Sequence, residues 1–495
     1  MKTVGMAHQL EGLARLEGKR NYGLFCEQGT GKTWIGLADA ERAFGLNKIN
    51  ALLVVAPKGV HTNWTRREIP THLEAPYKAA AYLAGSKRAL NAVKALSVEG
   101  GDKLRVMAVN IDALNHKEGF AVTRKFLTDH RAMMIVDESH RIKTPSAGCT
   151  KRVTTLGRLA IARRIATGTP LTNAPPDLFS QFEFLKPGML GSTSYRAFVA
   201  RYAELLPDDH HLMRHITTRM KQTNRWAANA MEAGTWQAPQ LYARDASGAP
   251  RWRNLDELRE LLAPLTYRVL KKDCLDLPEK IYQTRYFELS ATQQRVYQRV
   301  KEELIVEVGD DLLSVHALAA LMKLQQITSG FVNIEGEPVY ISDDNPRLAL
   351  LKEVITDQQG PFIVWARFRE EIAAIMRLLE EMKVPAVQYH GDVKTKDREM
   401  AVDSFQSGAA MAFVGQAGAG GIGLTLTAAE SAIYYSNDFN YGTRAQSEDR
   451  CHRKGTTKHV VYIDLCASDT VDEGIAAALQ RKADTAAEVL GDNIK

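Results

Sequence analysis

The chain has 495 residues, of which 25% are charged and 45% are hydrophobic. This composition is typical of a globular protein with two or three domains, and it excludes a disordered or fibrous chain. Lys and Arg number 64 against 58 Asp and Glu, and this mildly basic balance is compatible with a polyanionic partner.

The first informative feature is a glycine-rich loop between an expected strand and an expected helix. An apolar run at residues 22–26 predicts the strand, and the sequence EQGTGKT follows at residues 27–33. Strand, glycine loop and helix are the context of a phosphate-binding loop, in which backbone N–H groups surround an oligophosphate. We expect Lys32 at the β- and γ-phosphates and the Thr33 hydroxyl at Mg²⁺. The strict motif has glycine where this chain has Cys26, so the alternative is a plain glycine-rich turn.

Up to about residue 190, β-rich runs alternate with helical patterns, which is typical of a parallel α/β sheet. Most of the expected strands end in a polar or glycine-rich stretch. Because ligands bind at the carboxyl ends of strands in such sheets, we expect these stretches to line one crevice. The expected strands are residues 24–26, 51–56, 105–109, 132–136 and 164–166.

A pair of acids follows the fourth expected strand. Asp137 and Glu138 come directly after the apolar run MMIV. ATP hydrolysis needs one acid to hold Mg²⁺ and a second to orient and deprotonate the attacking water. Asp137 suits the metal role and Glu138 the general base. The alternative is a plain helix cap, since acids are common at helix starts.

The strand signal fades at residues 191–345, which we interpret as a helical insertion or bridge. The α/β alternation resumes at residue 346, so the expected domains are 1–190, 191–345 and 346–495. The expected helices of the middle part are 196–206, 255–272, 291–307 and 312–327. In the last part we expect strands at 362–366, 386–389, 411–415, 431–435 and 460–465, with helices at 370–382 and 395–406.

Further motifs accompany the phosphate loop and the acid pair in a fixed order. They occupy residues 8–9, 54–58, 63–64, 137–140, 167–173, 390–392, 418–429 and 446–455. On these motifs the chain resembles the Swi/Snf family of double-stranded DNA translocases, within superfamily 2 of helicase-type ATPases. The resemblance covers nearly the whole chain. It implies an α/β fold of two RecA-like parallel-sheet lobes with a helical insertion between them.

The resemblance implies that Gln9 recognises adenine and that Arg450 and Arg453 are arginine fingers from the second lobe. Positioned positive charge is what phosphoryl transfer requires, and two arginines three residues apart face the same way on a helix. The alternative is a solvated basic helix end paired with Glu448 and Asp449. The implied ATP-binding residues are Gln9, Gly29, Thr30, Gly31, Lys32 and Thr33. The implied catalytic residues are Lys32, Asp137, Glu138, Arg450 and Arg453, with Mg²⁺ at Thr33 and Asp137.

Candidate contacts to a DNA backbone are cations, hydroxyls and strand-end groups, which position a protein without reading sequence. They are Lys58, Asn63 and Trp64 in the first lobe and Arg367, His390, Thr425 and Thr427 in the second. Each could instead be ordinary surface or, for Trp64, core. Residues 208–253 interleave basic residues with tryptophan, which suits nucleic-acid binding. His211 and His215 could ligate a metal, but no cysteine pattern supports this, and structural or DNA contacts are favoured.

The sequence therefore predicts an ATP- and Mg²⁺-dependent motor on double-stranded DNA, which remodels protein–DNA complexes or DNA structures. The alternatives are a strand-separating helicase on forked DNA or RNA, and an ATP-gated clamp or motor subunit of a larger complex. A monomer is expected. The five cysteines form no C-x-x-C pair and no apolar run could span a bilayer, so we expect the cytoplasm of a bacterium or of a phage-infected host.

Overall fold

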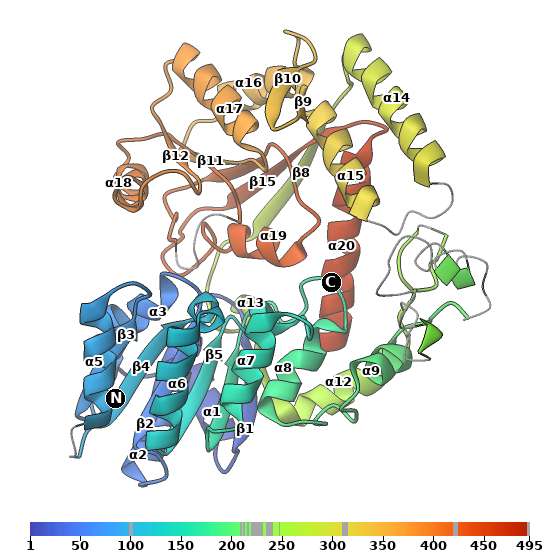
Figure 1. Ribbon diagram of the computed structural model, residues 1–495. Helices are drawn as coiled ribbons and strands as arrows, with labels where there is room; N and C mark the ends of the chain where they lie inside the picture. The colour runs from blue at the N-terminus through green and yellow to red at the C-terminus, as the bar shows by residue number, and fades with distance from the viewer. Residues whose placement is uncertain are drawn as a thin grey trace.

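The computed structural model describes residues 1–98, 102–207, 210, 213–214, 217–218, 231–233, 241–246, 248–308, 315–418 and 424–492. Most of the segment 208–253, with its basic residues, His211 and His215, lies outside the described residues. Two α/β lobes lie one above the other, and helix α20 runs along one side from the second lobe to the first (Figure 1). None of the described helices has the length and apolarity needed to span a bilayer.

The first lobe contains a seven-stranded parallel sheet in the order β3-β4-β2-β5-β6-β1-β7. Its central strands are nearly continuous apolar runs and are buried on both faces, as parallel strands covered by helices must be. The strands are β1 (Asn21–Cys26), β2 (Ala51–Ala56), β3 (Tyr77–Tyr82), β4 (Leu104–Asn110), β5 (Ala132–Asp137), β6 (Ala162–Ala166) and β7 (Thr266–Val269).

Helices cover both faces of this sheet, and α6, α7 and α8 lie in front of it in Figure 1. The longer helices are α1 (Ala7–Arg15), α2 (Lys32–Gly45), α5 (Lys87–Val98), α6 (Lys117–Asp129), α7 (Gly148–Gly157), α8 (Asp177–Leu185), α9 (Tyr195–Tyr202) and α12 (Leu255–Leu262). Shorter helices are α3 (Val60–Asn63), α4 (Ile69–His72) and α13 (Lys271–Cys274), with a π turn at Trp64–Glu68 between α3 and α4.

The second lobe contains a six-stranded parallel sheet in the order β12-β13-β11-β14-β15-β8. Its strands are β8 (Lys280–Phe287), β11 (Phe362–Trp365), β12 (Ala386–Tyr389), β13 (Ala412–Gly415), β14 (Ser431–Tyr434) and β15 (Val460–Ala467). Its helices are α14 (Ala291–Val308), α15 (Val315–Thr328), α16 (Pro346–Thr356), α17 (Arg369–Glu381), α18 (Thr395–Gln406), α19 (Tyr441–Glu448) and α20 (Val471–Leu490). The two sheets confirm the predicted α/β fold class of two parallel-sheet lobes.

The middle part, which we interpret from sequence as a helical insertion or bridge, also contains strands. The helix expected over 255–272 ends at Leu262, because Pro264 cannot continue it. The β-branched and aromatic residues that follow form β7, which pairs with β1. Strand β8 pairs with β15 at the edge of the second sheet. A hairpin of β9 (Phe331–Ile334) and β10 (Glu337–Tyr340) turns at Glu335 and Gly336, both with positive φ.

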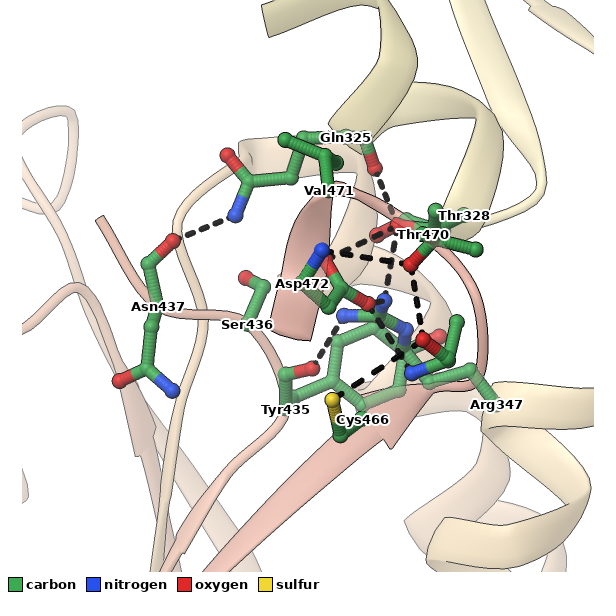
Figure 2. Close-up of polar contacts among 12 residues, drawn as sticks. Gln325, Thr328, Arg347, Tyr435, Ser436, Asn437, Cys466, Thr470, Val471 and Asp472 are labelled. Atoms are coloured by element: carbon green, nitrogen blue, oxygen red, sulfur yellow. Dashed lines mark hydrogen bonds and ion pairs between the residues drawn. The ribbon is translucent and has the colours of Figure 1, made fainter. Parts of the chain in front are cut away.

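Helix α20 joins the two lobes. At its beginning, Asp472 forms an ion pair with the buried Arg347, whose guanidinium also donates to the carbonyl of Tyr435 and the hydroxyl of Thr328 (Figure 2). At its end, Ala486 and Val489 are buried in the apolar core of the first lobe. The last turns of α20 therefore pack in the first lobe.

Candidate functional site

The phosphate loop begins where β1 ends and wraps directly into α2. Gly29 and Gly31 adopt positive φ of 84° and 90°, a conformation that favours glycine. A Cβ at Gly31 would come within 1.9 Å of Nε2 of Gln9. Glycine is therefore required at position 31 both by the backbone and by the neighbouring helix α1.

The amine of Lys32 lies inside this loop. It donates hydrogen bonds to the carbonyls of Cys26 at 2.8 Å and Glu27 at 3.1 Å. Thr33 follows it in the first turn of α2. Cys26 is fully buried, and burial raises the pKa of its thiol to about 12. Cys26, which departs from the strict motif, is thus an unreactive thiol that packs in the apolar core at the end of β1.

Helix α1 places Gln9 against the same loop. The Gln9 amide donates to the carbonyl of Thr30 at 3.2 Å, and its oxygen accepts from the backbone N–H of Met6. The ring of His8 contacts the same Thr30 carbonyl at 2.7 Å. The Thr30 hydroxyl donates to the carbonyl of Glu27 at 2.8 Å. All predicted nucleotide-binding residues therefore belong to one continuous structure.

The acid pair is buried at the carboxyl end of β5. Asp137 accepts from the indole N–H of Trp64 at 2.9 Å and from the backbone N–H of Glu138 at 3.0 Å. Glu138 has a positive φ of 53°, which is uncommon for a residue with a side chain and is found where the surroundings enforce it. The carboxylate of Glu138 accepts from the Thr167 hydroxyl at 3.2 Å.

Burial and neighbouring charges set the two acids apart. Burial, together with the charge of Glu138, raises the pKa of Asp137 to about 6. Burial acts to raise the pKa of Glu138 as well. The hydrogen bond and charge of His140, together with the charge of Lys32, outweigh this effect and lower the pKa of Glu138. Glu138 is therefore held ionised. Two buried carboxylates with one nearby ammonium leave negative charge that a divalent cation would offset.

This donor set fits Mg²⁺, which prefers carboxylate and hydroxyl oxygens together with substrate phosphates. Each oxygen of the Asp137 carboxylate accepts one hydrogen bond and retains a further lone pair. Within the described part of the chain no cluster of three or more His, Cys, Asp or Glu side chains could hold a metal by itself.

His140 connects this acid site to the second lobe. Its Nδ1 lies 3.0 Å from the Thr167 hydroxyl and 3.2 Å from Oε2 of Glu138. Its Nε2 lies 3.4 Å from Nε2 of Gln446 in α19. Residues that follow β5 and β6 thus meet a side chain of α19, and α19 faces the first lobe in Figure 1.

The two predicted arginine fingers do not share a helix, and that part of the prediction is wrong. Helix α19 ends at Glu448, and Arg450 and Arg453 lie in the turn that follows. Asp449 begins this turn, and we call residues 449–453 the finger turn. The early end of α19 is consistent with a buried ion cluster at Glu448, which accepts hydrogen bonds from Lys280, Tyr282 and Arg444.

Arg450 is buried and Arg453 is half-buried, and both lie on the side of the second lobe that faces the first. A Cβ at Gly29 would lie 3.7 Å from the Cβ of Arg453, so the finger turn lies against the phosphate loop. The Arg453 guanidinium donates to the Thr425 hydroxyl at 2.9 Å, and that of Arg450 lies over the ring of Trp365. Burial lowers the pKa of both arginines, because it partly removes their guanidinium groups from water.

The first lobe places two of its three predicted DNA contacts at the surface. Lys58 and Asn63 are exposed, and the Asn63 amide donates to Glu68 at 3.3 Å. The prediction for Trp64 is wrong, because the side chain is only 2% exposed and its N–H is bonded to Asp137. Asn63 and Trp64 are adjacent in sequence, and no local pattern distinguishes the exposed side chain of Asn63 from the buried one of Trp64.

The second lobe places its four predicted DNA contacts in partly buried positions. The Arg367 guanidinium donates to Gln325, and the Thr427 hydroxyl accepts from Gln406 at 3.2 Å. Thr425 is engaged with Arg453, and His390 is half-buried after β12. These residues lie on the second lobe and do not meet the first-lobe candidates in a direct contact that the described residues record.

A cleft of about 790 Å³ is lined by residues of both lobes, among them Lys58, Thr62, His140, Tyr389, Arg398 and Arg450. His140, which contacts Glu138, and Arg450 therefore line the same space as one predicted DNA contact, Lys58.

Two structural contributors were not identified from sequence. Ser139 is buried and donates to Gln181 at 2.7 Å, and the Gln181 amide donates to the carbonyl of Pro170 at 2.8 Å. This ties the acid strand to the residues after β6. Lys271 is the second, and its side chain is buried beside the finger turn, where its ammonium donates to Asp449. Both contacts join residues far apart in sequence, and no local pattern could predict them.

Two protein-family models match the chain. The model of the SNF2-related domain matches residues 8–333, and the model of the helicase conserved C-terminal domain matches residues 346–455. Together they include the phosphate loop, the acid pair and the finger turn.

Individual relatives are distant and longer. The chain is 24% identical to chromodomain-helicase-DNA-binding protein 1-like of Danio rerio, covering 93% of this chain and 41% of that protein. It is 23% identical to an uncharacterized ATP-dependent helicase of Mycoplasma genitalium, over 73% of this chain and 31% of that one. The chain thus spans less than half the length of these relatives. The solved SWI2/SNF2 ATPase core of Sulfolobus solfataricus in complex with dsDNA is 21% identical, covers 99% of this chain and 94% of that one, and has a TM-score of 0.40.

Proposed function

Because the chain belongs to the SNF2-related family, we propose that it is a helicase-type ATPase core that moves on double-stranded DNA without separating the strands. In this proposal ATP binds between the lobes, and its hydrolysis drives cycles of closure and opening. Such cycles remodel DNA structures or remove bound proteins. The observation that supports it best is the contact of the finger turn with the phosphate loop, at Arg453 and Gly29.

We assign nucleotide binding to the phosphate loop. Gln9 contacts this loop and is proposed to read the adenine. On ATP binding the amine of Lys32 exchanges its two carbonyl partners for phosphate oxygens. Thr33 and Asp137 would hold Mg²⁺, which neutralises phosphate charge in the transition state.

Glu138 is proposed as the general base. Its ionised carboxylate accepts the proton of the attacking water, and the Thr167 hydroxyl fixes its orientation. Arg450 and Arg453 would stabilise the negative charge that develops on the transferring phosphoryl group. Because the acids come from one lobe and the cations from the other, hydrolysis requires the lobes to be closed.

The track is proposed to be the DNA backbone, contacted by Lys58 and Asn63 on one lobe and by Arg367, His390, Thr425 and Thr427 on the other. Contacts of this kind are independent of base sequence and weaken steeply with salt. Thr425 links the two functions, because its hydroxyl accepts a hydrogen bond from Arg453. A DNA phosphate that bound Thr425 would break this hydrogen bond and release the Arg453 guanidinium, so that DNA binding would affect the arginine finger.

The test is ATP hydrolysis measured without nucleic acid and then with blunt duplex DNA, forked DNA, single-stranded DNA or RNA. The proposal predicts the largest stimulation by blunt duplex. Preference for forks, single strands or RNA would instead indicate a strand-separating helicase. ATP binding with no hydrolysis on any substrate would indicate an ATP-gated clamp or a motor subunit that needs its partners.

A further inference from the structure

The connection between the two sheets passes directly beside the finger turn. Strand β7 of the first sheet ends at Val269 and β8 of the second sheet begins at Lys280. We call the residues between them, with Lys280 included, the hinge (residues 270–280). Two segments among the described residues pass from one lobe to the other, the hinge and α20. A rotation of one lobe relative to the other would therefore change the backbone of the hinge.

Lys271 in the hinge contacts both halves of the proposed active site. Its backbone N–H donates to the carboxylate of Glu27, the first residue of the phosphate loop, at 2.5 Å. Its ammonium donates to the carboxylate of Asp449 at 2.5 Å and to the carbonyl of His452 at 2.6 Å. Asp449 directly precedes Arg450, and His452 directly precedes Arg453. One side chain therefore holds the residue before each arginine.

A second hinge residue contacts the finger turn, and a third contacts the residue before it. The carbonyl of Pro278 is 2.7 Å from Nε2 of His452, and the ammonium of Lys280 donates to Glu448 at 3.0 Å. The finger turn is thus bonded to the hinge at Asp449 and His452, and to the rest of the second lobe through Arg450 and Arg453.

Stability alone does not explain a charged residue at this place. Lys271 is 4% exposed, and burial lowers the pKa of its ammonium even though Asp449 favours the charged form. Buried ion pairs gain little net stability, because the loss of hydration offsets the attraction. An ammonium has three donors, and here it satisfies two acceptors of the finger turn at once.

We propose that Lys271 is a positioning residue that fixes Arg450 and Arg453 against the phosphate loop when the lobes close. This inference rests on the ATPase activity proposed above. Because the ammonium of Lys271 contacts Asp449 and His452 and not the phosphate loop or the DNA candidates, replacing the side chain should reduce the rate of hydrolysis without weakening substrate binding. A displacement of about 1 Å in a catalytic group can cost about 10²-fold in rate.

The experiment compares Lys271→Met with the wild type in duplex-stimulated ATP hydrolysis. Methionine keeps the apolar stem and removes the three donors. We expect kcat to fall 10- to 100-fold, with the Kd of a fluorescent ATP analogue and of duplex DNA unchanged within twofold. If Lys271→Met does not fold, Asp449→Asn serves instead, since it removes the charge that the ammonium contacts and keeps an acceptor. We expect a smaller loss in kcat for Asp449→Asn, of 3- to 30-fold.

A triple variant separates positioning from a general structural role. In an Arg453→Ala, Arg450→Ala background the fingers are absent, so adding Lys271→Met should change the single-turnover rate less than twofold. The matched control is Arg347→Met, which breaks a buried ion pair of the second lobe that touches no finger residue (Figure 2). It should lower the melting temperature and leave kcat of the folded protein within threefold.

Each result decides the question. Unchanged kcat in Lys271→Met or Asp449→Asn overturns the inference, and so does an equal loss with and without the fingers. A parallel loss of ATP affinity would also overturn it, because the residue would then act on binding. A wild type that hydrolyses no ATP on any nucleic acid would instead remove the proposed function itself.

Discussion

The two lobes have the same architecture but opposite electrostatic needs at the cleft. In the first lobe, Asp137 and Glu138 are buried acids, and burial together with the charge of Glu138 raises the pKa of Asp137 to about 6. In the second lobe, Arg450 is buried and Arg453 is half-buried, and burial lowers the pKa of both arginines. Neither arrangement is favourable by itself. Under the proposed function, ATP, Mg²⁺ and the opposite lobe would supply each lobe with the charges that it needs.

The largest expected effect comes from the arginines. Replacing Arg453 by Ala removes a positioned cation from the transition state and should lower kcat by about 10³-fold or more. ATP and duplex DNA should still bind, because neither interaction depends mainly on this residue. Steady-state hydrolysis and DNA binding by fluorescence anisotropy would measure the two effects. The matched control is Arg377→Ala, an exposed arginine on α17 that should leave both unchanged.

Replacing Glu138, the proposed base of the first lobe, should also slow hydrolysis without weakening ATP binding. Glu138→Gln keeps the shape and removes the base, so hydrolysis should fall by about 10²- to 10⁴-fold. The loss of a buried negative charge should leave ATP affinity equal or higher. Single-turnover hydrolysis and nucleotide titration would measure this. Glu17→Gln, an exposed acid changed in the same way, is the control. Activity above a tenth of the wild type would argue against Glu138 as the base.

Gly31→Ala tests whether the phosphate loop needs its glycine. The new Cβ would collide with the Gln9 amide and would force alanine into a positive φ. We expect at least a tenfold rise in the Kd for ATP. Gly18→Ala separates the two causes, because Gly18 also has positive φ but has open space where its Cβ would lie. Its cost should be limited to backbone strain of about 1 kcal/mol in stability, with nucleotide affinity retained.

The smallest expected effect concerns Trp64, which the structure moves from the DNA interface to the acid site. Trp64→Phe removes one hydrogen bond to Asp137, a charged acceptor, worth about 1.5–3 kcal/mol at most. We expect kcat to fall 3- to 20-fold and the Mg²⁺ requirement to rise. Affinity for duplex DNA should stay within twofold. A selective loss of DNA binding would restore the original assignment.

Local motifs allowed the sequence to predict the nucleotide side of the site. The phosphate loop, the acid pair and the helix at residues 395–406 follow from patterns within a few residues, and the structure places each element as expected. The edge strands β7 and β8 were missed. Strand β7 is short and follows a helical pattern, and β8 is exposed along most of its length, so neither shows a buried apolar run.

Tertiary contacts account for the remaining errors. The inward turn of Trp64 depends on an acid 73 residues away. The end of α19 coincides with a cluster in which Lys280 and Tyr282 reach Glu448 from a different strand. The contact of Lys271 with Asp449 joins residues 178 positions apart. Composition and periodicity describe a residue and its neighbours in sequence, and such pairs lie beyond them.

Displacement of a third strand from a DNA triplex tests the central claim most directly. A motor that moves along intact duplex DNA should release the triplex-forming oligonucleotide when ATP is added, while the two duplex strands stay paired. Glu138→Gln and Arg453→Ala should release none. Strand separation of forked DNA without triplex displacement would contradict translocation on duplex and favour a helicase. ATP hydrolysis with neither outcome would contradict a motor altogether.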